Sequence, residues 1–324
     1  MEVLRLTLRQ LQIFVAVAHS GSTTAASVEI ALSQSATSSA VNELERLLSL
    51  RLFDRAGKRL LLNDNGRALL PRALALLDAA AGIEQMSQGG SAQTQSLRIG
   101  ASTTIGNYLL PSLLRRFMGE RHRDEASGWQ SRTRIANTEA ICAAVAAFEL
   151  DIGLIAGPCH QATLTVTPWL QDELVVVEAA PVVHAATTER LPLKALRERV
   201  WLLREPGSGT REATDQLLLP HLRAYTRSIE LGSSEAIKQA AAEGLGTACL
   251  SNWVVREALQ SGRLCRLPTT LPRLTRQCYW VVHRNKQPTA AMLRFIEVAT
   301  ALESGSGSPS ASPRPRTAAP AGAA

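Results

Sequence analysis

The stretch STTAASVEIALSQSATSSAVNELERLLSLRLFDR, residues Ser22–Arg55, decides how the N-terminal part of this chain folds. Apolar residues at the spacing of one helix face precede it: Leu11, Phe14, Val15 and Ala18. Gly21 follows them where a helix commonly ends, and Ser22 can cap a second helix. That helix is expected to end near Leu32, and Ser33 can cap a third. The sequence therefore predicts three short helices within about fifty residues.

The third predicted helix has a polar face opposite its packing face, which includes Val41 and Leu44. The polar face carries side chains that can hydrogen-bond base edges in a major groove: Gln34, Ser35, Ser38, Ser39 and Asn42. Basic residues that can contact phosphates or enter a minor groove follow: Arg51, Arg55, Lys58 and Arg59. A solvated polar face beside a solvated run of charges has the same composition. Composition alone leaves both interpretations open.

A wing and a connecting helix are predicted next. Leu60–Leu62 and the turn-forming Asn63–Gly66 favour a β-hairpin. From Arg67 to about Gln85 a helical pattern resumes, with an apolar stripe that needs a partner: Leu70, Ala73, Leu77 and Ala80. We expect this stripe to pair with a second copy of the chain, in a homodimer or homotetramer. A flexible segment, Ser87–Gln95, follows.

Beyond Ser96 short strands alternate with helices, which is typical of a mainly parallel sheet covered on both sides. The candidate strands are Leu97–Gly100, Asp151–Ala156, Leu174–Val177, Val200–Leu203, Gly246–Leu250 and Tyr279–His283. The tail from Glu303 to Ala324 is rich in Ser, Gly, Pro and Ala, and we expect it to be disordered.

Several predicted helix starts in this second part carry hydroxyl or amide side chains just after a strand. They are Ser102, Thr103 and Thr104, then Asn137 and Thr138, then Ser208 and Thr210, then Ser233. Such helix starts expose unpaired N–H groups and favour anions, although ordinary capping explains any one of them. Arg204 and Arg211 flank the glycine loop and can pair with an acidic ligand or remain surface charges. Trp169 can line a ligand cleft or pack in a core.

Composition narrows the function. The formal charge is +7, but residues 1–90 hold nine Lys and Arg against eight Asp and Glu, so a case for DNA binding depends on local geometry. No apolar run is long enough to span a membrane and no signal peptide is recognisable, so we expect a cytoplasmic protein. The five cysteines are scattered, without a pair spaced for zinc or redox chemistry, and we expect buried free thiols.

Enzyme motifs are not found. No nucleophile elbow, P-loop or His-Glu-x-x-His is present, and the six histidines are scattered. Cys159 and His160 adjoin, but adjacency in sequence does not supply the geometry of a nucleophile and its base. We therefore expect no catalysis, no cofactor and no metal.

Ser22–Arg55 closely resembles the helix-turn-helix of LysR-type transcription regulators. The resemblance includes Ala25-Ala26, Ser33-Gln34, Leu44-Glu45 and Leu52-Phe53-Asp54-Arg55. It continues in three later stretches: SLRIGASTTIGNYLLP (96–111), FELDIGLIAG (148–157) and GSSEAIKQAAAEGLGTACLS (232–251). The family usually has Pro where Ser35 stands, and often a basic residue where Ser39 or Asn42 stands.

The resemblance implies an α/β architecture in consecutive parts. They are a winged helix-turn-helix over residues 1–64, a linker helix over 65–90, and an effector domain over 91–302 similar to periplasmic binding proteins. This domain would consist of subdomain I (about 91–163 and 270–302) and subdomain II (about 164–269). The two crossovers between them would lie near Thr163–Thr167 and Pro268–Thr270.

By the same resemblance the protein is expected to bind duplex DNA specifically and to be controlled by a small, anionic effector in the cleft between the subdomains. Ser102, Thr104 and the Ser208–Thr210 loop are its leading contacts. The stretch REPGSGTRE (204–212) resembles sensors linked to inorganic sulfur and carbon assimilation. The alternative is a solute-binding protein that uses the same sensor fold without a DNA role.

Overall fold

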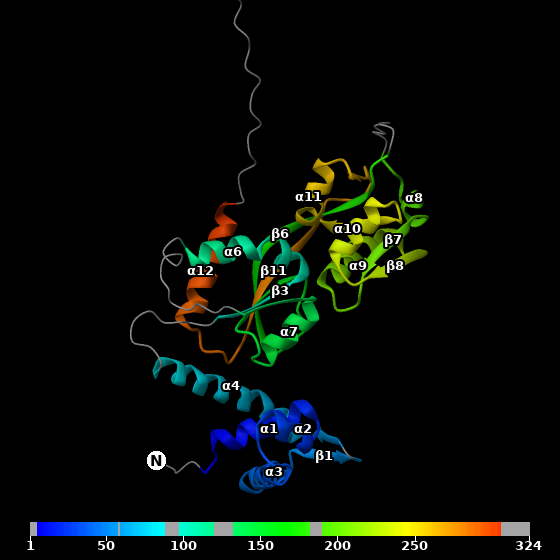
Figure 1. Ribbon diagram of the computed structural model, residues 1–324. Coiled ribbons are helices and arrows are strands. Elements are labelled where there is room, and N and C mark those ends of the chain that lie inside the picture. Colours follow the sequence, from blue (N-terminus) through cyan, green and yellow to red (C-terminus); the bar gives the residue numbers. More distant parts are fainter. Residues whose placement is uncertain (1–4, 58, 88–96, 120–131, 182–189, 306–324) are drawn as a thin grey trace, which may run out of the picture.

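The computed structural model describes residues 5–57, 59–87, 97–119, 132–181 and 190–305. They form an N-terminal helical unit, a long connecting helix and a larger unit built on one sheet (Figure 1). Within these ranges, none of the helices combines the length and the apolar character that a membrane-spanning helix needs.

Three helices and a hairpin make up the N-terminal unit. Their bounds are α1 Leu8–Ser20, α2 Thr23–Glu29, α3 Gln34–Leu48, β1 Phe53–Ala56 and β2 Arg59–Leu62. Gly21 ends α1 in the left-handed conformation, with φ 65°. The side chain of Ser22 accepts hydrogen bonds from the first turn of α2, and that of Ser33 accepts one from Ala36 N at 3.1 Å. The three predicted helices and their caps are confirmed.

The hairpin turns at a different place from the predicted one. β1 and β2 pair antiparallel as far as Ala56 and Arg59, and the turn between them contains Gly57 with φ +62°. The predicted turn at Asn63–Gly66 was wrong. This segment starts the next helix, and the Asn63 side chain accepts a hydrogen bond from Gly66 N at 3.0 Å. Asparagine suits both a turn and a helix start, so composition does not separate the two.

The connecting helix, α4 (Asp64–Ser87), packs one face on the N-terminal core. Ala73 is fully buried there, and Leu70 and Leu77 pack against the same core. The prediction that this stripe faces a second copy was therefore wrong, because α1 offers it an apolar surface within the same chain. Leu76 and Ile83, which are 52% and 68% exposed, lie away from that core.

A cluster of charges joins α4 to the larger unit. Asp78 of α4 accepts hydrogen bonds from Arg98 at 3.0 Å and from Lys286 at 2.7 Å. The same two cations pair with Asp151 at 2.6 and 2.7 Å. Burial alone would raise the pKa of Asp151, but hydrogen bonds from Arg98 and Lys286 outweigh burial and the pKa is lowered.

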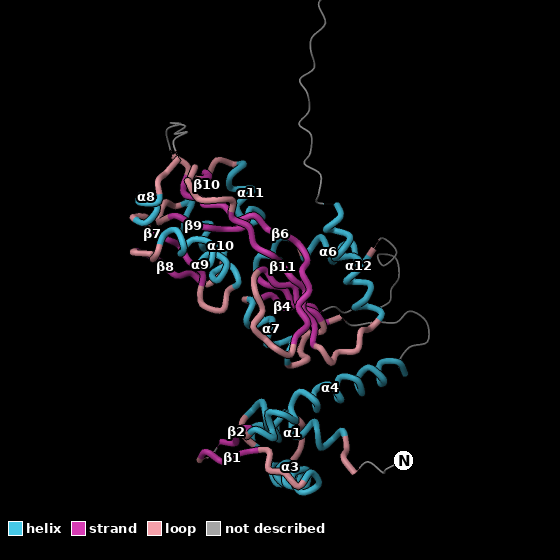
Figure 2. The backbone as a smooth tube through the Cα atoms, turned by 180° about the vertical axis from the view of Figure 1, so that it is seen from behind, coloured by secondary structure: helices cyan, strands magenta, loops and turns pink. Residues whose placement is uncertain are grey.

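The larger unit is built on a nine-stranded sheet in the order β4-β3-β5-β11-β6-β9-β7-β8, with β10 paired to β6 (Figure 2). Its strands are β3 Arg98–Ser102, β4 Arg132–Ala136, β5 Ile152–Ala156, β6 Leu164–Ala179, β7 Val200–Arg204, β8 Arg227–Leu231, β9 Thr247–Ser251, β10 Leu264–Arg266 and β11 Leu274–His283. Every candidate strand from the sequence overlaps one of these. The strands missed are β4, β8 and β10. β4 and β8 are the two edges of the sheet and lack the apolar run of a central strand.

Helices cover both faces of this sheet. They are α5 Thr103–Tyr108, α6 Leu110–Met118, α7 Thr138–Ala146, α8 Leu193–Arg197, α9 Gly209–Leu222, α10 Ser234–Ala242, α11 Asn252–Gln260 and α12 Ala290–Gly305. In the half predicted as subdomain I, α6 and α12 share one core and α7 contributes to another. In the half predicted as subdomain II, α10 and α11 contribute to one hydrophobic core, and α8 and α9 contribute to a separate one. Because α12 continues to Gly305, the predicted tail begins inside a helix, and residues 306–324 lie outside the described ones.

The subdomains are joined by two long antiparallel strands, β6 and β11. β6 pairs with β11 from His283–Leu164 to Leu274–Leu174, and farther along with β9 of subdomain II. The predicted crossovers at 163–167 and 268–270 therefore lie at or before the starts of these strands. Beside Asp172 and Arg276 the sheet is continuous, because β6 pairs with β11 up to Leu174 and with β9 from Leu174 onward.

Glu45 of α3 fixes the hairpin to that helix. Its buried carboxylate accepts hydrogen bonds from Leu52 N at 2.7 Å and Phe53 N at 3.4 Å, and it pairs with Arg51 at 3.1 Å. One side chain thus satisfies the backbone at the point where the chain enters β1.

Glu45→Ala should leave the Leu52 and Phe53 amides buried without an acceptor, at a cost of about 1–3 kcal/mol. We expect faster hydrogen exchange at these two amides, measured by mass spectrometry on peptides that span them. Glu43→Ala is the matched control on the same helix, because the Glu43 carboxylate pairs with Arg46 at the surface. Native protection of both amides in Glu45→Ala would contradict this role.

Candidate functional site

α3 presents the predicted base-contacting side chains together on one side. Ser38 is half-buried, and the others are exposed: Gln34, Ser35, Ser39 and Asn42. The amide nitrogen of Gln34 donates to Thr23 Oγ1 at 3.2 Å, which links α3 to α2. The face opposite is buried in the core through Val41 and Leu44. This arrangement leaves short hydrogen-bonding groups on a helix held from behind, as a major-groove reader requires.

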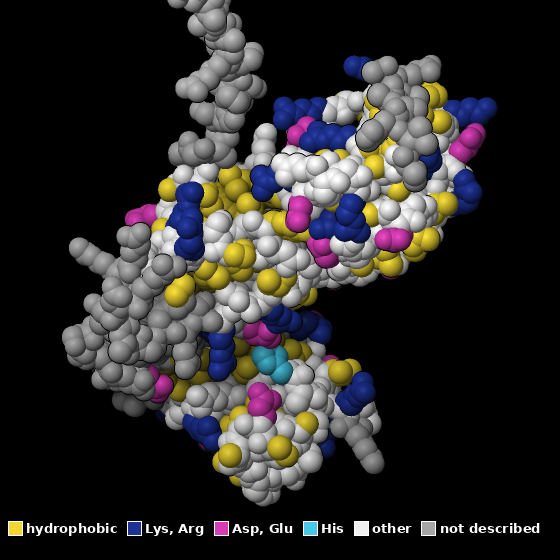
Figure 3. Space-filling model, turned by 45° about the horizontal axis from the view of Figure 1, so that its top comes forward, with side chains coloured by type: hydrophobic (Ala, Val, Ile, Leu, Met, Phe, Trp, Pro, Cys, Tyr) yellow, Lys and Arg dark blue, Asp and Glu magenta, His cyan; other side chains and the backbone are white. Residues whose placement is uncertain are grey.

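The basic residues flank this helix. Arg51 has an 81% exposed side chain, and Arg55 and Arg59 lie exposed on β1 and β2. Lys58, which was also predicted to contact DNA, lies outside the described residues. On the face shown in Figure 3, Lys and Arg side chains are spread out rather than gathered in one stripe. Contacts with DNA phosphates would therefore come from the individual arginines near α3, not from a continuous basic surface.

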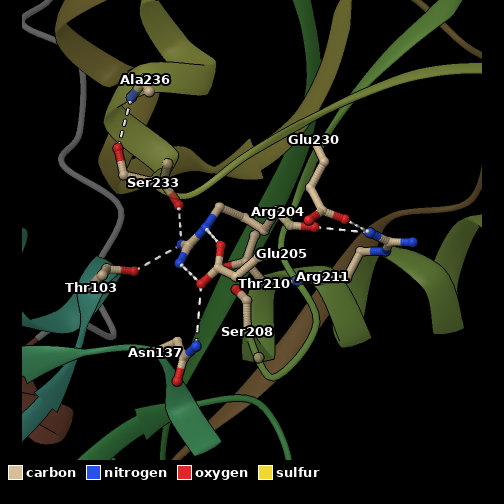
Figure 4. A network of polar contacts seen from close by, with 12 residues as sticks. Thr103, Asn137, Arg204, Glu205, Ser208, Thr210, Arg211, Glu230, Ser233 and Ala236 are labelled. Atoms are coloured by element: carbon tan, nitrogen blue, oxygen red, sulfur yellow. Dashed lines mark hydrogen bonds and ion pairs between the residues drawn. The ribbon is translucent and has the colours of Figure 1, made fainter. Parts of the chain in front are cut away.

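Arg204, at the end of β7, is the centre of a polar network in the larger unit (Figure 4). Its side chain is 1% exposed. Nε and Nη2 donate to the two carboxylate oxygens of Glu205 at 2.7 Å each, and Nη1 donates to Thr103 Oγ1 at 2.9 Å and Ser234 Oγ at 3.1 Å. Asn137 Nδ2 donates to Glu205 at 3.3 Å. Three of the predicted effector residues, Thr103, Asn137 and Arg204, therefore meet here.

The predicted helix-start residues divide into capping and non-capping side chains. Asn137, Ser208 and Ser233 each cap the helix that follows them. Ser102 does not cap α5; its buried hydroxyl accepts a hydrogen bond from Ala156 N at 3.1 Å instead. These hydroxyl and amide groups are thus already engaged within the chain.

Helix starts from the two subdomains touch one another. Thr138 Oγ1 accepts a hydrogen bond from Gly209 N at 3.2 Å, and Glu139 N donates to Gly207 O at 3.0 Å. A Cβ atom on Gly157 would lie 2.7 Å from the Cα atom of Gly209, so only glycine allows this approach. The two subdomains are therefore in direct contact along the starts of α7 and α9.

A second buried guanidinium lies where β6 and β11 pass between the subdomains. Arg276 Nε donates to Asp172 Oδ2 at 2.9 Å, and the two side chains are 3% and 1% exposed. Nη1 donates to Thr210 Oγ1 at 2.8 Å and to Ala156 O at 3.3 Å, and Nη2 donates to Thr104 Oγ1 at 3.4 Å. Two further predicted effector residues, Thr104 and Thr210, are thus brought together by Arg276.

The sequence contained a signal for Arg276 that went unused. Leu274, Arg276 and Cys278 alternate as inward-facing, buried positions of β11, so a charged residue occupies a core register. Asp172, its partner, faces it directly in the strand pairing. Burial raises the pKa of Asp172 even though Arg276 and a hydrogen bond from Ser251 favour its charged form.

Trp169 and Arg211, which were also considered as effector contacts, bind other parts of the protein instead. Trp169 is buried in the core of subdomain I and its Nε1 donates to Ala299 O at 2.8 Å, so the cleft-lining prediction was wrong and the core alternative holds. Arg211 pairs with Asp215 at 2.8 Å and with Glu230 at 3.4 Å, within its own subdomain. The sequence alone did not separate the two alternatives for Trp169, because a large amphipathic side chain is common both in cores and in ligand clefts.

All five cysteines are free, and burial raises the pKa of Cys249 and of Cys278 to about 12. The His160 ring pairs with the carboxylate of Glu212 at 3.0 Å. His160 thus links the segment between β5 and β6 to α9.

Comparison with known proteins identifies both parts of the chain. Residues 8–67 match the family model "Bacterial regulatory helix-turn-helix protein, lysR family", and residues 90–303 match "LysR substrate binding domain". The chain belongs to the LysR family. As a LysR-family protein it is a DNA-binding transcription regulator rather than an enzyme, and the solute-binding alternative is dropped because the helix-turn-helix is present.

Relatives of this LysR-family chain agree with that assignment. It is 45% identical to the "Uncharacterized HTH-type transcriptional regulator YeiE" of Escherichia coli K12, over 91% of this chain and 97% of that one. A full-length OxyR variant from Pseudomonas aeruginosa has a similar fold, with TM-score 0.66, 24% identity and coverage of 92% and 95%. The Synechocystis CcmR regulatory domain, solved in complex with 2-PG, has TM-score 0.56 and 29% identity over 65% of this chain and 98% of that one.

Arg276→Met should leave Asp172 buried without its cation, at a cost of about 3–5 kcal/mol in unfolding free energy. All five tryptophans follow residue 128, so their fluorescence during urea unfolding monitors the larger unit alone. Arg276→Met combined with Asp172→Asn should recover part of the loss, since the buried charge is gone. A single variant as stable as the native chain, or a double variant no better than the single, would contradict the importance of this pair.

Proposed function

We propose that this LysR-family regulator is a cytoplasmic homodimer or homotetramer that binds its operator through α3 and the β1–β2 hairpin, under the control of a small anion bound between the subdomains. One observation supports the proposed control by an anion. Two buried guanidinium groups, Arg204 and Arg276, lie where helix starts from both subdomains meet.

The chemistry of this region favours an anion. Arginine stays charged when buried, and its planar fork suits carboxylates and other oxyanions. Helix starts add N–H groups and the positive end of the helix dipole. The similar CcmR regulatory domain was solved in complex with 2-PG, which supports a ligand role for the corresponding domain of this chain.

Isothermal titration of sulfate, phosphate, acetate and 2-PG into the full chain tests binding, and repeating a DNA titration at saturating ligand tests control. A controlling ligand must differ in affinity for the states that DNA also distinguishes, so it must shift the DNA isotherm. A ligand that binds and leaves DNA affinity and DNA bending unchanged would rule out control by that ligand.

Removing base contacts and phosphate contacts should have different effects on DNA binding. Asn42→Ala and Ser38→Ala should relax sequence preference at about 1–3 kcal/mol for each lost base contact. Arg55→Ala should weaken binding to all sequences and flatten its salt dependence. Gel-shift titrations on the neighbouring promoter and on an unrelated duplex, at several salt concentrations, separate the two. If Asn42→Ala and Ser38→Ala both keep the native sequence preference, α3 does not contact the bases.

We propose the exposed side of α4 as the contact between copies, through Leu76 and Ile83. Leu76→Arg should place a charge in that contact and lower the mass measured by sedimentation at micromolar concentration. Leu245→Arg is the control, since Leu245 is similarly exposed at 57% but lies in subdomain II. Equal masses for the native chain and Leu76→Arg would exclude this face.

A further inference from the structure

The carboxylate of Glu205 is bound as a ligand carboxylate would be. Both of its oxygens accept hydrogen bonds from Arg204 at 2.7 Å, a bidentate arrangement, and one also accepts from Asn137 at 3.3 Å. Arg204 comes from subdomain II and Asn137 from the start of α7 in subdomain I. The Glu205 side chain therefore bridges the two subdomains at predicted effector contacts (Figure 4).

The rest of the Arg204 guanidinium has neutral partners. Its Nη1 atom donates to the hydroxyl groups of Thr103 and Ser234. Glu205 thus supplies the anionic partner among the hydrogen bonds that the described residues make with Arg204. A buried arginine needs such a partner, because an isolated buried charge is costly.

The two partners differ in access to solvent. The Arg204 side chain is 1% exposed, whereas that of Glu205 is 25% exposed. The cation is therefore fixed inside the fold, while its anion lies on the outer side, where a dissolved anion can approach. The Arg276–Asp172 pair has no such outlet, since both side chains are almost completely buried.

We infer that Glu205 occupies the anion-binding position of the ligand-free chain and that the effector is a compact oxyanion or carboxylate that displaces it from Arg204 and Asn137. The inference rests on the proposed function and specifies how its site works. Glu205 is an internal competitor, so the apparent dissociation constant equals the intrinsic one divided by the fraction of chains in which Arg204 is free.

The charge state of Glu205 fits this role. Burial would raise the pKa of Glu205, but hydrogen bonds from Arg204 outweigh burial and lower it. The side chain is therefore ionised at neutral pH and competes as an anion.

Glu205→Gln tests the competition, because glutamine keeps the shape of the side chain and removes its charge. Calorimetric titration of the full chain with sulfate, phosphate and acetate at constant ionic strength should show about ten-fold tighter binding to Glu205→Gln for the anion that fits, since a charge-assisted hydrogen bond no longer has to be displaced. Comparison of the three anions separates tetrahedral oxyanions from a carboxylate. Glu205→Asp keeps the charge on a shorter side chain, and its affinity should lie between the two.

Glu212→Gln is the matched control. Glu212 pairs with His160, so this variant removes one equal charge and one contact between subdomains without touching Arg204. Its affinity should stay within about two-fold of native, because a half-exposed pair contributes little.

The outcomes separate the two proposals. Native binding with unchanged or weaker binding to Glu205→Gln overturns the competitor role and leaves the anion site standing. Equal tightening in Glu205→Gln and Glu212→Gln also overturns it, because the effect is then one of net charge. Binding of none of these anions to the native chain or to Glu205→Gln refutes both the competitor and the anion site.

Discussion

The buried ion pair of Arg276 and Asp172 is the interaction on which the effector domain depends. The two residues face each other on β11 and β6, where the sheet passes from one subdomain to the other. Burying two charges is favourable only when the geometry is good and the remaining polar atoms are satisfied. Here Thr104, Thr210 and the Ala156 carbonyl accept the remaining donors of Arg276. The pair thereby holds the starts of α5 and α9 and the end of β5 together.

The second pair, Arg204 and Glu205, has the same chemistry in a different setting. Burial raises the pKa of Asp172 above its ordinary value, whereas Arg204 lowers that of the more exposed Glu205. A carboxylate without access to water is confined to its partner, while one at the edge can exchange for another anion. The two ion pairs have the same chemistry and differ in burial: the buried Asp172 is held by Arg276, whereas the partly exposed Glu205 can be exchanged for another anion.

Sequence reasoning succeeded where a local rule determines structure. The helices of the N-terminal unit and the caps Ser22 and Ser33 follow from spacing and hydrogen-bonding side chains, and the central strands follow from apolar runs. Asn63 was misassigned because turns and helix starts favour the same residue. β4 and β8 were missed because edge strands lack an apolar run. Arg276 was missed because its partners come from β6, α5 and α9, which only the folded topology brings together.

Strands connect the cleft with the linker helix. β3 begins at Arg98 and ends at Ser102, and β5 follows Asp151 and ends at Ala156. β11 runs the opposite way, from Arg276 near the cleft to His283, just before Lys286. Thus three neighbouring strands each have one end among the cleft residues and the other beside Asp78 of α4. β3, β5 and β11 are neighbours paired by backbone hydrogen bonds, so the residues around Arg276 and Asp78 of α4 lie at opposite ends of one continuous ladder, which the ion pairs of Arg98 and Lys286 join to α4.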